Sequence, residues 1–133
     1  MEYPKAKITR LLIGYFEDDN RRIEHAFAVL KEAELLQIKS DTAYDDEIVI
    51  AAALLHDIGI KISEEKLGYN NSKTQEEFGP PAAEELLKSI DFPLAKIAIV
   101  KNIISNHHSP SKYDYPELEL LKKADRIINN NES

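Results

Sequence analysis

Apolar residues recur along the chain at intervals of three and four, which is the period of one face of an α-helix. No segment alternates apolar and polar residues as a half-buried β-strand would. Start signals agree with this period, because Pro4 precedes the first periodic segment and Asp18 to Asn20 offer an N-cap to the second. The pattern predicts one all-α domain over residues 1–133, with helices at about 5–16, 20–39, 45–57, 80–90, 93–107 and 116–128.

The remaining segments are expected to be less regular. Residues 60–73 contain Gly68 and a run of small polar residues, so we expect a surface loop over a cleft. Residues 74–77 have capping-box spacing and open a short helical turn, which Gly79 and two prolines interrupt. The polar tail at 129–133 is expected to fray.

The third predicted helix has no polar face. Its run from Ile48 to Leu55 has eight apolar residues, far fewer than the roughly 18–20 that cross a bilayer. Its alanines and leucines favour a helix over a strand. A helix that is apolar all round lies in the centre of a domain, and Gly59 is expected to end it in a left-handed cap.

Composition narrows the class of protein. With 133 residues, 43% hydrophobic and 31% charged, the chain matches one ordinary globular domain. It has no cysteine, which excludes disulfides, thiolate metal sites and thiol catalysis. Residues 1–4 lack the regions of a signal peptide, so we expect a cytoplasmic protein that binds no membrane. The net charge of −7 argues against broad nucleic-acid binding but permits a small anionic substrate held by a metal ion.

Two polar residues stand on apolar helical stripes. Asp125 lies four residues after Leu121 and three before Ile128, so it faces inward among aliphatic side chains. His107 lies three residues after Ile104 and faces inward in the same way. A buried carboxylate without a partner loses several kcal/mol to desolvation. Something cationic must therefore meet the carboxylate on the last helix.

All four histidines lie at or beside an apolar helix face. His56 and Asp57 directly follow the central apolar run. His25 borders the apolar face of the second predicted helix, and His108 lies beside His107. Imidazole and carboxylate groups together suit Fe, Mn, Co, Ni or Zn, and a divalent ion would neutralise the inward carboxylates.

Each of these residues also has an ordinary structural explanation. A buried histidine is often hydrogen-bonded within the core, and Asp125 could pair with Lys61, Arg22 or Arg126. A helical bundle whose inward polar residues merely pair with one another is therefore an alternative, although it must account for all of them at once.

Three motifs occur in a recognisable order. They are Arg-Ile-Glu-His-Ala at 22–26, Ala-Leu-Leu-His-Asp-Ile-Gly at 53–59 and Leu-Lys-Lys-Ala-Asp-Arg-Ile at 121–127. A His, then a His-Asp doublet, then a distant Asp, separated here by 31 and 68 residues, resembles the HD-domain superfamily of metal-dependent phosphohydrolases in a small single-domain form. Asn-His-His-Ser-Pro at 106–110 resembles the histidine-containing helix end of many relatives.

The resemblance covers most of the chain and implies both a fold and a reaction. It implies an all-α bundle of five or six helices that holds one or two divalent ions and hydrolyses phosphate mono- or diesters, often of nucleotides. By match with the family pattern, the metal ligands would be His25, His56, Asp57 and Asp125. The leading hypothesis is one divalent transition-metal ion that activates a water for attack on a small phosphorylated substrate.

Further roles are expected near this ligand set. His107, and His108 beside it, would bind phosphate or protonate the leaving oxygen, because histidine titrates near neutral pH. Lys61 and Arg22 would neutralise phosphate charge. The catalytic candidates are thus Asp57, His107 and Lys61, and the substrate-binding candidates are His108, Arg22 and Lys61.

Two departures from the family pattern keep other functions open. Many relatives have Lys or an acid where this chain has Ile60, and two-metal relatives have a His near the stretch that is Gln-Glu-Glu at 75–77 here. These departures favour one ion, or a second ion held by His107 and a glutamate. They also motivate a metal- or nucleotide-binding module without catalysis. A third alternative is a di-iron oxygenase, because some relatives have that activity. A di-iron centre needs more protein ligands than this chain offers beyond the four named above.

Overall fold

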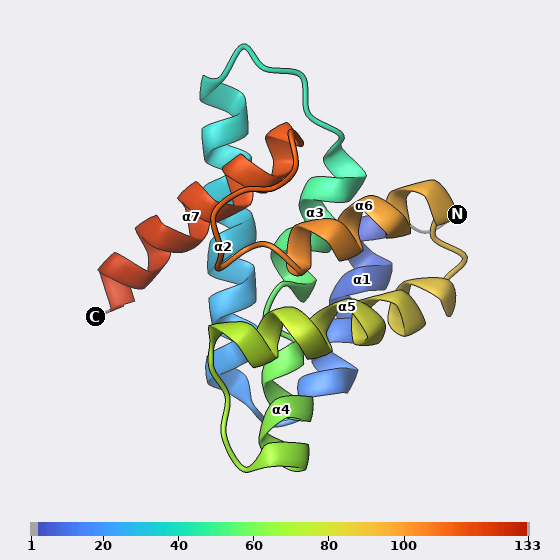
Figure 1. The fold of residues 1–133 in the computed structure, drawn as a ribbon. Helices are drawn as coiled ribbons and strands as arrows, with labels where there is room; N and C mark the ends of the chain where they lie inside the picture. Colours follow the sequence, from blue (N-terminus) through green and yellow to red (C-terminus); the bar gives the residue numbers. More distant parts are fainter. Residues whose placement is uncertain (1–2, 133) are drawn as a thin grey trace.

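The computed structural model describes residues 3–132 and confirms the all-α fold class. Within that range the chain forms seven helices and no strand (Figure 1). The helices are α1 (Pro4–Phe16), α2 (Asn20–Lys39), α3 (Asp46–Leu55), α4 (Gly59–Leu67), α5 (Ser72–Lys88), α6 (Leu94–Ile104) and α7 (Pro116–Glu132). Over the same residues, no helix combines the length and apolar character that crossing a membrane requires.

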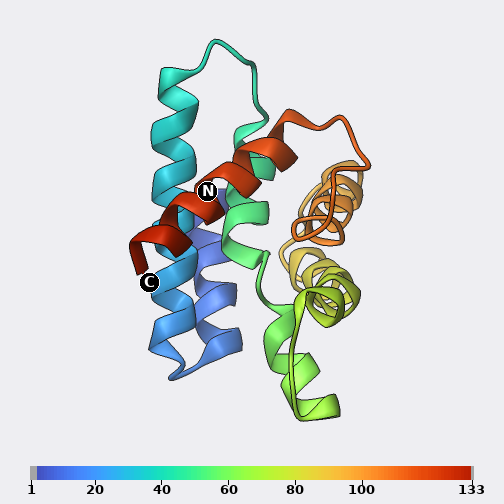
Figure 2. The same cartoon turned by 60° about the vertical axis from the view of Figure 1, so that its left-hand side comes forward.

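Helix α3 lies at the centre of the bundle. It contacts α1, α2, α6 and α7, and every residue from Ala51 to Leu55 is at most 1% exposed. This confirms the position expected for a helix that is apolar all round. Helix α7 crosses both α2 and α3, while α5 and α6 pack side by side (Figure 2). The end of α3 therefore lies within reach of α2, α7 and the turn after α6.

Side-chain caps set the start of α2 and of α3. Asp19 accepts a hydrogen bond from the backbone N–H of Arg22 at the start of α2, as its place in the sequence predicts. Asp45 accepts one from the backbone N–H of Ile48 at the start of α3. Both helices thus begin at short acceptor side chains that satisfy otherwise unpaired N–H groups.

The surface loop expected at 60–73 is wrong for most of its length, because α4 occupies residues 59–67. Ser63 is fully buried in this helix, and its hydroxyl donates to Oγ1 of Thr74 at 2.8 Å. A polar residue on the inner face conceals the helical period from a hydrophobic pattern. Gly68, with φ of +79°, ends α4 in the left-handed conformation.

The left-handed cap expected at Gly59 is also wrong, since this residue begins α4 with an ordinary helical backbone. Its small size serves another purpose. A Cβ at Gly59 would lie 2.6 Å from the backbone oxygen of Gln75 and 2.7 Å from the backbone nitrogen of Gly79. Glycine therefore permits the close approach of α4 to α5.

Helix α5 is continuous, contrary to the expected interruption at Gly79 and the prolines. Pro80 and Pro81 lie inside it, and its capping box joins Asn71 to Thr74. Proline removes backbone donors, but its fixed φ is close to the helical value. Because α5 packs against both α4 and α6, its tertiary contacts offset the lost hydrogen bonds.

Two helix ends also differ from expectation. Helix α6 ends at Ile104, so His107 lies in the turn that follows, although it is buried as its spacing predicts. Helix α7 continues to Glu132, so the expected frayed tail is helical over its described part; Ser133 lies outside the described residues. A contact between Glu132 and His25 joins this last turn to α2.

Candidate metal centre

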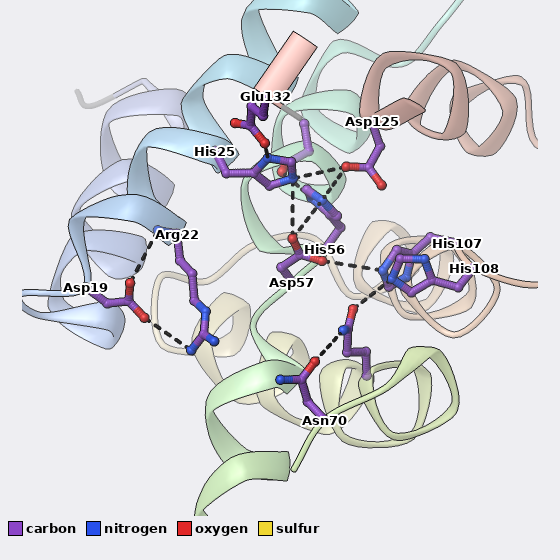
Figure 3. Close-up of polar contacts among 12 residues, drawn as sticks. Asp19, Arg22, His25, His56, Asp57, Asn70, His107, His108, Asp125 and Glu132 are labelled. Carbon is purple, nitrogen blue, oxygen red and sulfur yellow. Dashed lines mark hydrogen bonds and ion pairs between the residues drawn. The ribbon is translucent and has the colours of Figure 1, made fainter. Parts of the chain in front are cut away.

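Four candidate ligands from distant parts of the chain meet at the end of α3 (Figure 3). His25 belongs to α2 and Asp125 to α7, His56 is the C-cap of α3, and Asp57 follows it. Oδ1 of Asp125 lies 3.1 Å from Nε2 of His25 and 3.3 Å from Nε2 of His56. Oδ2 of Asp57 lies 3.5 Å from Nε2 of His25 and 3.3 Å from Nε2 of His56. The fold thus brings together all four residues that the family pattern implies as ligands.

The ligand-type atoms form two sets. His25, His56 and Asp125, called here the helix set, offer atoms that all lie within 4.8 Å of one another. Asp57, His107 and His108, called here the turn set, do the same. Asp57 faces both sets, because its Oδ2 contacts the helix set while its Oδ1 lies 3.7 Å from Nε2 of His107.

Two ring nitrogens in the centre are buried without a hydrogen-bond partner: Nε2 of His56 and Nε2 of His107. In each ring the other nitrogen, Nδ1, donates to the carbonyl three residues earlier, that of Ala53 at 2.8 Å and that of Ile104 at 2.6 Å. This local bond turns each Nε2 inward with a lone pair available. A buried polar atom without a partner calls for an explanation, and an imidazole held in this way is the usual form of a metal ligand. The donor set therefore fits a divalent ion.

The ionisation of the side chains in the centre also favours a bound cation. The hydrogen bond from His25 to Asp125 raises the pKa of His25. Burial lowers the pKa of His56, but the charge of Asp57 and the contact with Asp125 outweigh it, so this pKa lies well above its usual value. Burial opposes ionisation of both carboxyl groups, yet the neighbouring histidines hold the pKa of Asp57 and of Asp125 below the usual range. The centre thus favours positive charge at the inward nitrogens, whether a proton or a metal ion supplies it.

The turn set depends on a loop that other side chains hold. The rings of His107 and His108 are in contact, with centroids 3.9 Å apart and planes tilted by 43°, and Nε2 of His108 donates to Oε1 of Gln75 at 2.7 Å. Glu76 accepts from the backbone N–H of His108 at 2.9 Å and from the hydroxyl of Ser109 at 2.6 Å. Helix α5 therefore positions the two histidines of the turn.

The family model called HD domain matches residues 22–130. The chain belongs to the HD domain family. This confirms the resemblance seen in the order of its His and Asp residues, and the matched range contains both the helix set and the turn set.

Two other proteins are similar to this HD domain over most of its length. An uncharacterized protein of Clostridium beijerinckii is 25% identical over 116 residues, which are 84% of this chain and 69% of the relative. The crystal structure of a predicted HD superfamily hydrolase from an uncultured Thermotogales bacterium is similar with a TM-score of 0.70 and 28% identity. That match covers 92% of this chain but 66% of the other, so the HD domain spans less than two thirds of that hydrolase.

A cavity of about 500 Å³ lies beside the helix set of the HD domain. Its lining residues are Asp19, Arg21, Arg22, His25, Asp57, Ile60, Asn129 and Glu132. Arg22 bonds Glu64 through two nitrogens at 3.0 and 3.1 Å and lies 3.2 Å from Asp19. The structure therefore places Arg22 beside two candidate ligands, with its charge already shared by two carboxylates.

Lys61 is the predicted site residue that the fold does not bring to the centre. Its Nζ donates to the backbone carbonyl of Tyr15 at 2.7 Å and lies 5.1 Å from the centroid of the Tyr15 aromatic ring. It is not among the residues that line the cavity. The observed contact is with α1, and a role of Lys61 toward phosphate stays a prediction.

Three residues support the centre through contacts that the sequence did not predict. Asn106 is 1% exposed and holds the turn, because its side chain donates to the carbonyl of Pro110 and accepts from the N–H of Lys112. Glu76 holds the same turn from α5. Glu132 contacts His25 from α7. Each has a signal in the sequence: Asn106 begins the 106–110 motif, Glu76 lies in the 75–77 stretch, and Glu132 lies seven residues, or about two helical turns, after Asp125.

Proposed function

We propose that this HD domain is a divalent-metal-dependent phosphohydrolase that cleaves a phosphate mono- or diester. One observation carries the proposal: the buried Nε2 of His56 has no hydrogen-bond partner, yet it faces the carboxylates of Asp57 and Asp125 beside the imidazole of His25. Membership of the HD family and similarity to an HD superfamily hydrolase support a hydrolytic function at the level of the superfamily.

The proposed ligands of one divalent transition-metal ion are His25, His56, Asp57 and Asp125. Two imidazoles and two carboxylates suit Fe, Mn, Co, Ni or Zn. When bound, such an ion polarises a phosphoryl oxygen and lowers the pKa of its water from 15.7 toward about 7. The turn set offers a position for a second ion.

The other residues of the centre would bind and orient the substrate. Arg21 and Arg22 line the cavity and provide positive charge for a phosphate group. Partial desolvation of its ring, together with the neighbouring His107, lowers the pKa of His108, so this imidazole is neutral at pH 7 and would accept a proton from the attacking water. We assign contact with phosphate to both histidines of the turn, and His107, which lies beside the carboxylate of Asp57, would protonate the leaving oxygen.

The test combines metal analysis with a substrate panel. The purified protein is analysed for metals, reloaded with the metal found, and assayed against nucleoside monophosphates, cyclic nucleotides and an aryl phosphate. We expect hydrolysis that a chelator abolishes and that Asp57→Asn removes, whereas the exposed Asp114→Asn leaves it unchanged. A metal-loaded protein that hydrolyses none of these compounds would contradict the proposal.

A binding module is the second candidate. Two observations favour it: Ile60 lines the cavity where many relatives have a charged residue, and Glu64 and Asp19 already neutralise Arg22. In that case calorimetry would show nucleotide binding to the metal-loaded protein, while the same nucleotide remains uncleaved.

A further inference from the structure

The imidazoles of His25, His56 and His107 each have a hydrogen-bond acceptor at Nδ1. For His56 and His107 the acceptor is a backbone carbonyl, whereas for His25 it is a side-chain carboxylate. His56 and His107 each donate to a backbone carbonyl three residues earlier, so their own chain segment orients the ring. His25 lies inside α2, where its backbone neighbours are engaged in the helix. Its Nδ1 meets a side chain 107 residues away, Oε1 of Glu132 at 3.0 Å.

Helix α7 thus places a carboxylate on each nitrogen of the His25 ring (Figure 3). Asp125 lies 3.1 Å from Nε2, and Glu132 lies 3.0 Å from Nδ1. The two acids are seven residues apart, which puts them on the same face of α7 about two turns from each other. That face packs against α2.

We propose that Glu132 is a positioning residue for metal binding by His25. Its carboxylate accepts the Nδ1–H of His25, and this bond keeps the proton on Nδ1, so that Nε2 presents a lone pair beside Asp57 and Asp125 once an ion takes the place of the Nε2 proton. The inference rests on the metal site proposed above. It follows from the chemistry of histidine ligands, since the partner of the second ring nitrogen orients the ring and raises the basicity of the ligating one.

The bond also makes metal affinity depend on the end of α7. Glu132 and Asn129 both line the cavity beside His25, so the last turns of α7 form part of its wall. Backbone carbonyls orient His56 and His107 wherever their helices form. The orientation of His25, in contrast, requires that the end of α7 packs on α2.

A titration of the metal-free protein with Zn²⁺, followed by calorimetry with a competing chelator, tests the inference. Removal of an outer partner of a metal-binding histidine costs about 10- to 100-fold in affinity. We expect Glu132→Ala to weaken Zn²⁺ binding by that factor, and Glu132→Gln to restore most of it because an amide oxygen also accepts from Nδ1–H. The matched control is Glu24→Ala, which removes an exposed carboxylate directly before His25 and should leave the affinity unchanged.

Nuclear magnetic resonance of ¹⁵N-histidine-labelled, Zn²⁺-loaded protein gives a second measurement that a general loss of stability would not imitate. We expect the Nδ1 proton of His25 to be observed in the wild type and in Glu132→Gln, and to exchange rapidly in Glu132→Ala. Glu132→Ser repeats the comparison, so the result does not depend on the folding of one variant.

Two failures can be told apart. If Asp125→Asn abolishes Zn²⁺ binding while Glu132→Ala and Glu132→Ser bind as the wild type does, the role of Glu132 is wrong and the metal site stands. If the wild type binds no Zn²⁺, or Asp125→Asn binds it equally well, both the metal site and the role of Glu132 are overturned.

Discussion

The two ligand sets of the centre are built in different ways. The helix set joins one residue each from α2, from the end of α3 and from α7, and its closest contacts are 3.1–3.3 Å. In the turn set, two of the three residues are adjacent in one turn, His108 is exposed, and the approach of His107 to Asp57 is 3.7 Å. Helix packing thus preorganises the helix set, whereas the turn set relies on hydrogen bonds from α5. We infer that the resident ion belongs to the helix set together with Asp57, and that His107 and His108 handle substrate and protons.

The strongest test of this division removes Asp57, which belongs to the turn set and also contacts the helix set. Asp57→Ala takes away the oxygen that faces the helix set and the oxygen that faces His107. Loss of a residue that merely hydrogen-bonds to a metal ligand already lowers metal affinity or activity by about 10- to 100-fold. We therefore expect loss of Asp57 itself to lower the phosphatase activity by more than about 100-fold and to lower the metal content as well. Elemental analysis and steady-state kinetics measure both. Retention of the metal with full activity would remove Asp57 from the centre.

A second test disturbs the support of the turn set through the backbone. Gly59→Ala would place a Cβ 2.6 Å from the backbone oxygen of Gln75, the residue that contacts His108. We expect a loss of about 1–3 kcal/mol in the free energy of unfolding, as for other overpacked sites. Urea unfolding gives the value. Gly14→Ala is the matched control, because its Cβ would meet nothing within 4 Å in α1, and this change should stabilise the protein by up to about 1 kcal/mol.

A third test releases the turn without touching a candidate ligand. Glu76→Ala removes the acceptor of the His108 N–H and of the Ser109 hydroxyl. We expect activity to fall about tenfold while the affinity of the helix set for Zn²⁺ stays the same, since loosely held catalytic groups lose geometry first. The exposed neighbour Glu77→Ala should change neither quantity. An equal loss of metal affinity in Glu76→Ala would show that the two sets are not separable.

The smallest effect expected is on the pH dependence of stability. The raised pKa values of His25 and His56 stabilise the metal-free fold below about 6.5, and this contribution is lost as the pH rises through their folded-state pKa values. The lowered pKa values of Asp57 and Asp125 stabilise it above about 3.9, and this contribution is lost as the pH falls through their folded-state values. Metal-free protein should therefore be most stable between about pH 4 and 6.5.

Bound metal reverses the upper part of this profile, because it takes the place of the protons on the histidines. Melting temperatures at pH 5, 6.5 and 8, with Zn²⁺ and with a chelator, check the expectation. The difference in melting temperature between the Zn²⁺-loaded and the chelator-treated protein should widen by a few degrees toward pH 8. Parallel curves would show that the ion does not bind at these nitrogens.

Much of the fold could be predicted from periodicity, whereas the candidate ligands as a set came from the resemblance to the HD family. Asp125 and His107 interrupt apolar stripes, and both are buried as that pattern requires. Other features could not be predicted. Ser63 conceals the inner face of α4, and the two prolines lie inside α5, which packs on two other helices. Periodicity also could not show that the side chain of Lys61 donates to the backbone carbonyl of Tyr15.

The amino-acid sequence by itself determined which residues face inward and that their chemistry suits a divalent cation, because helical period and side-chain type are local properties. Tertiary structure alone decided which inward residues share a ligand set and what supports each of them. Crossing angles and distances between helices separate the helix set from the turn set, and these depend on the packing of the whole bundle. The pairing of Glu132 with His25 arises in the same way, since it exists only where α7 lies against α2.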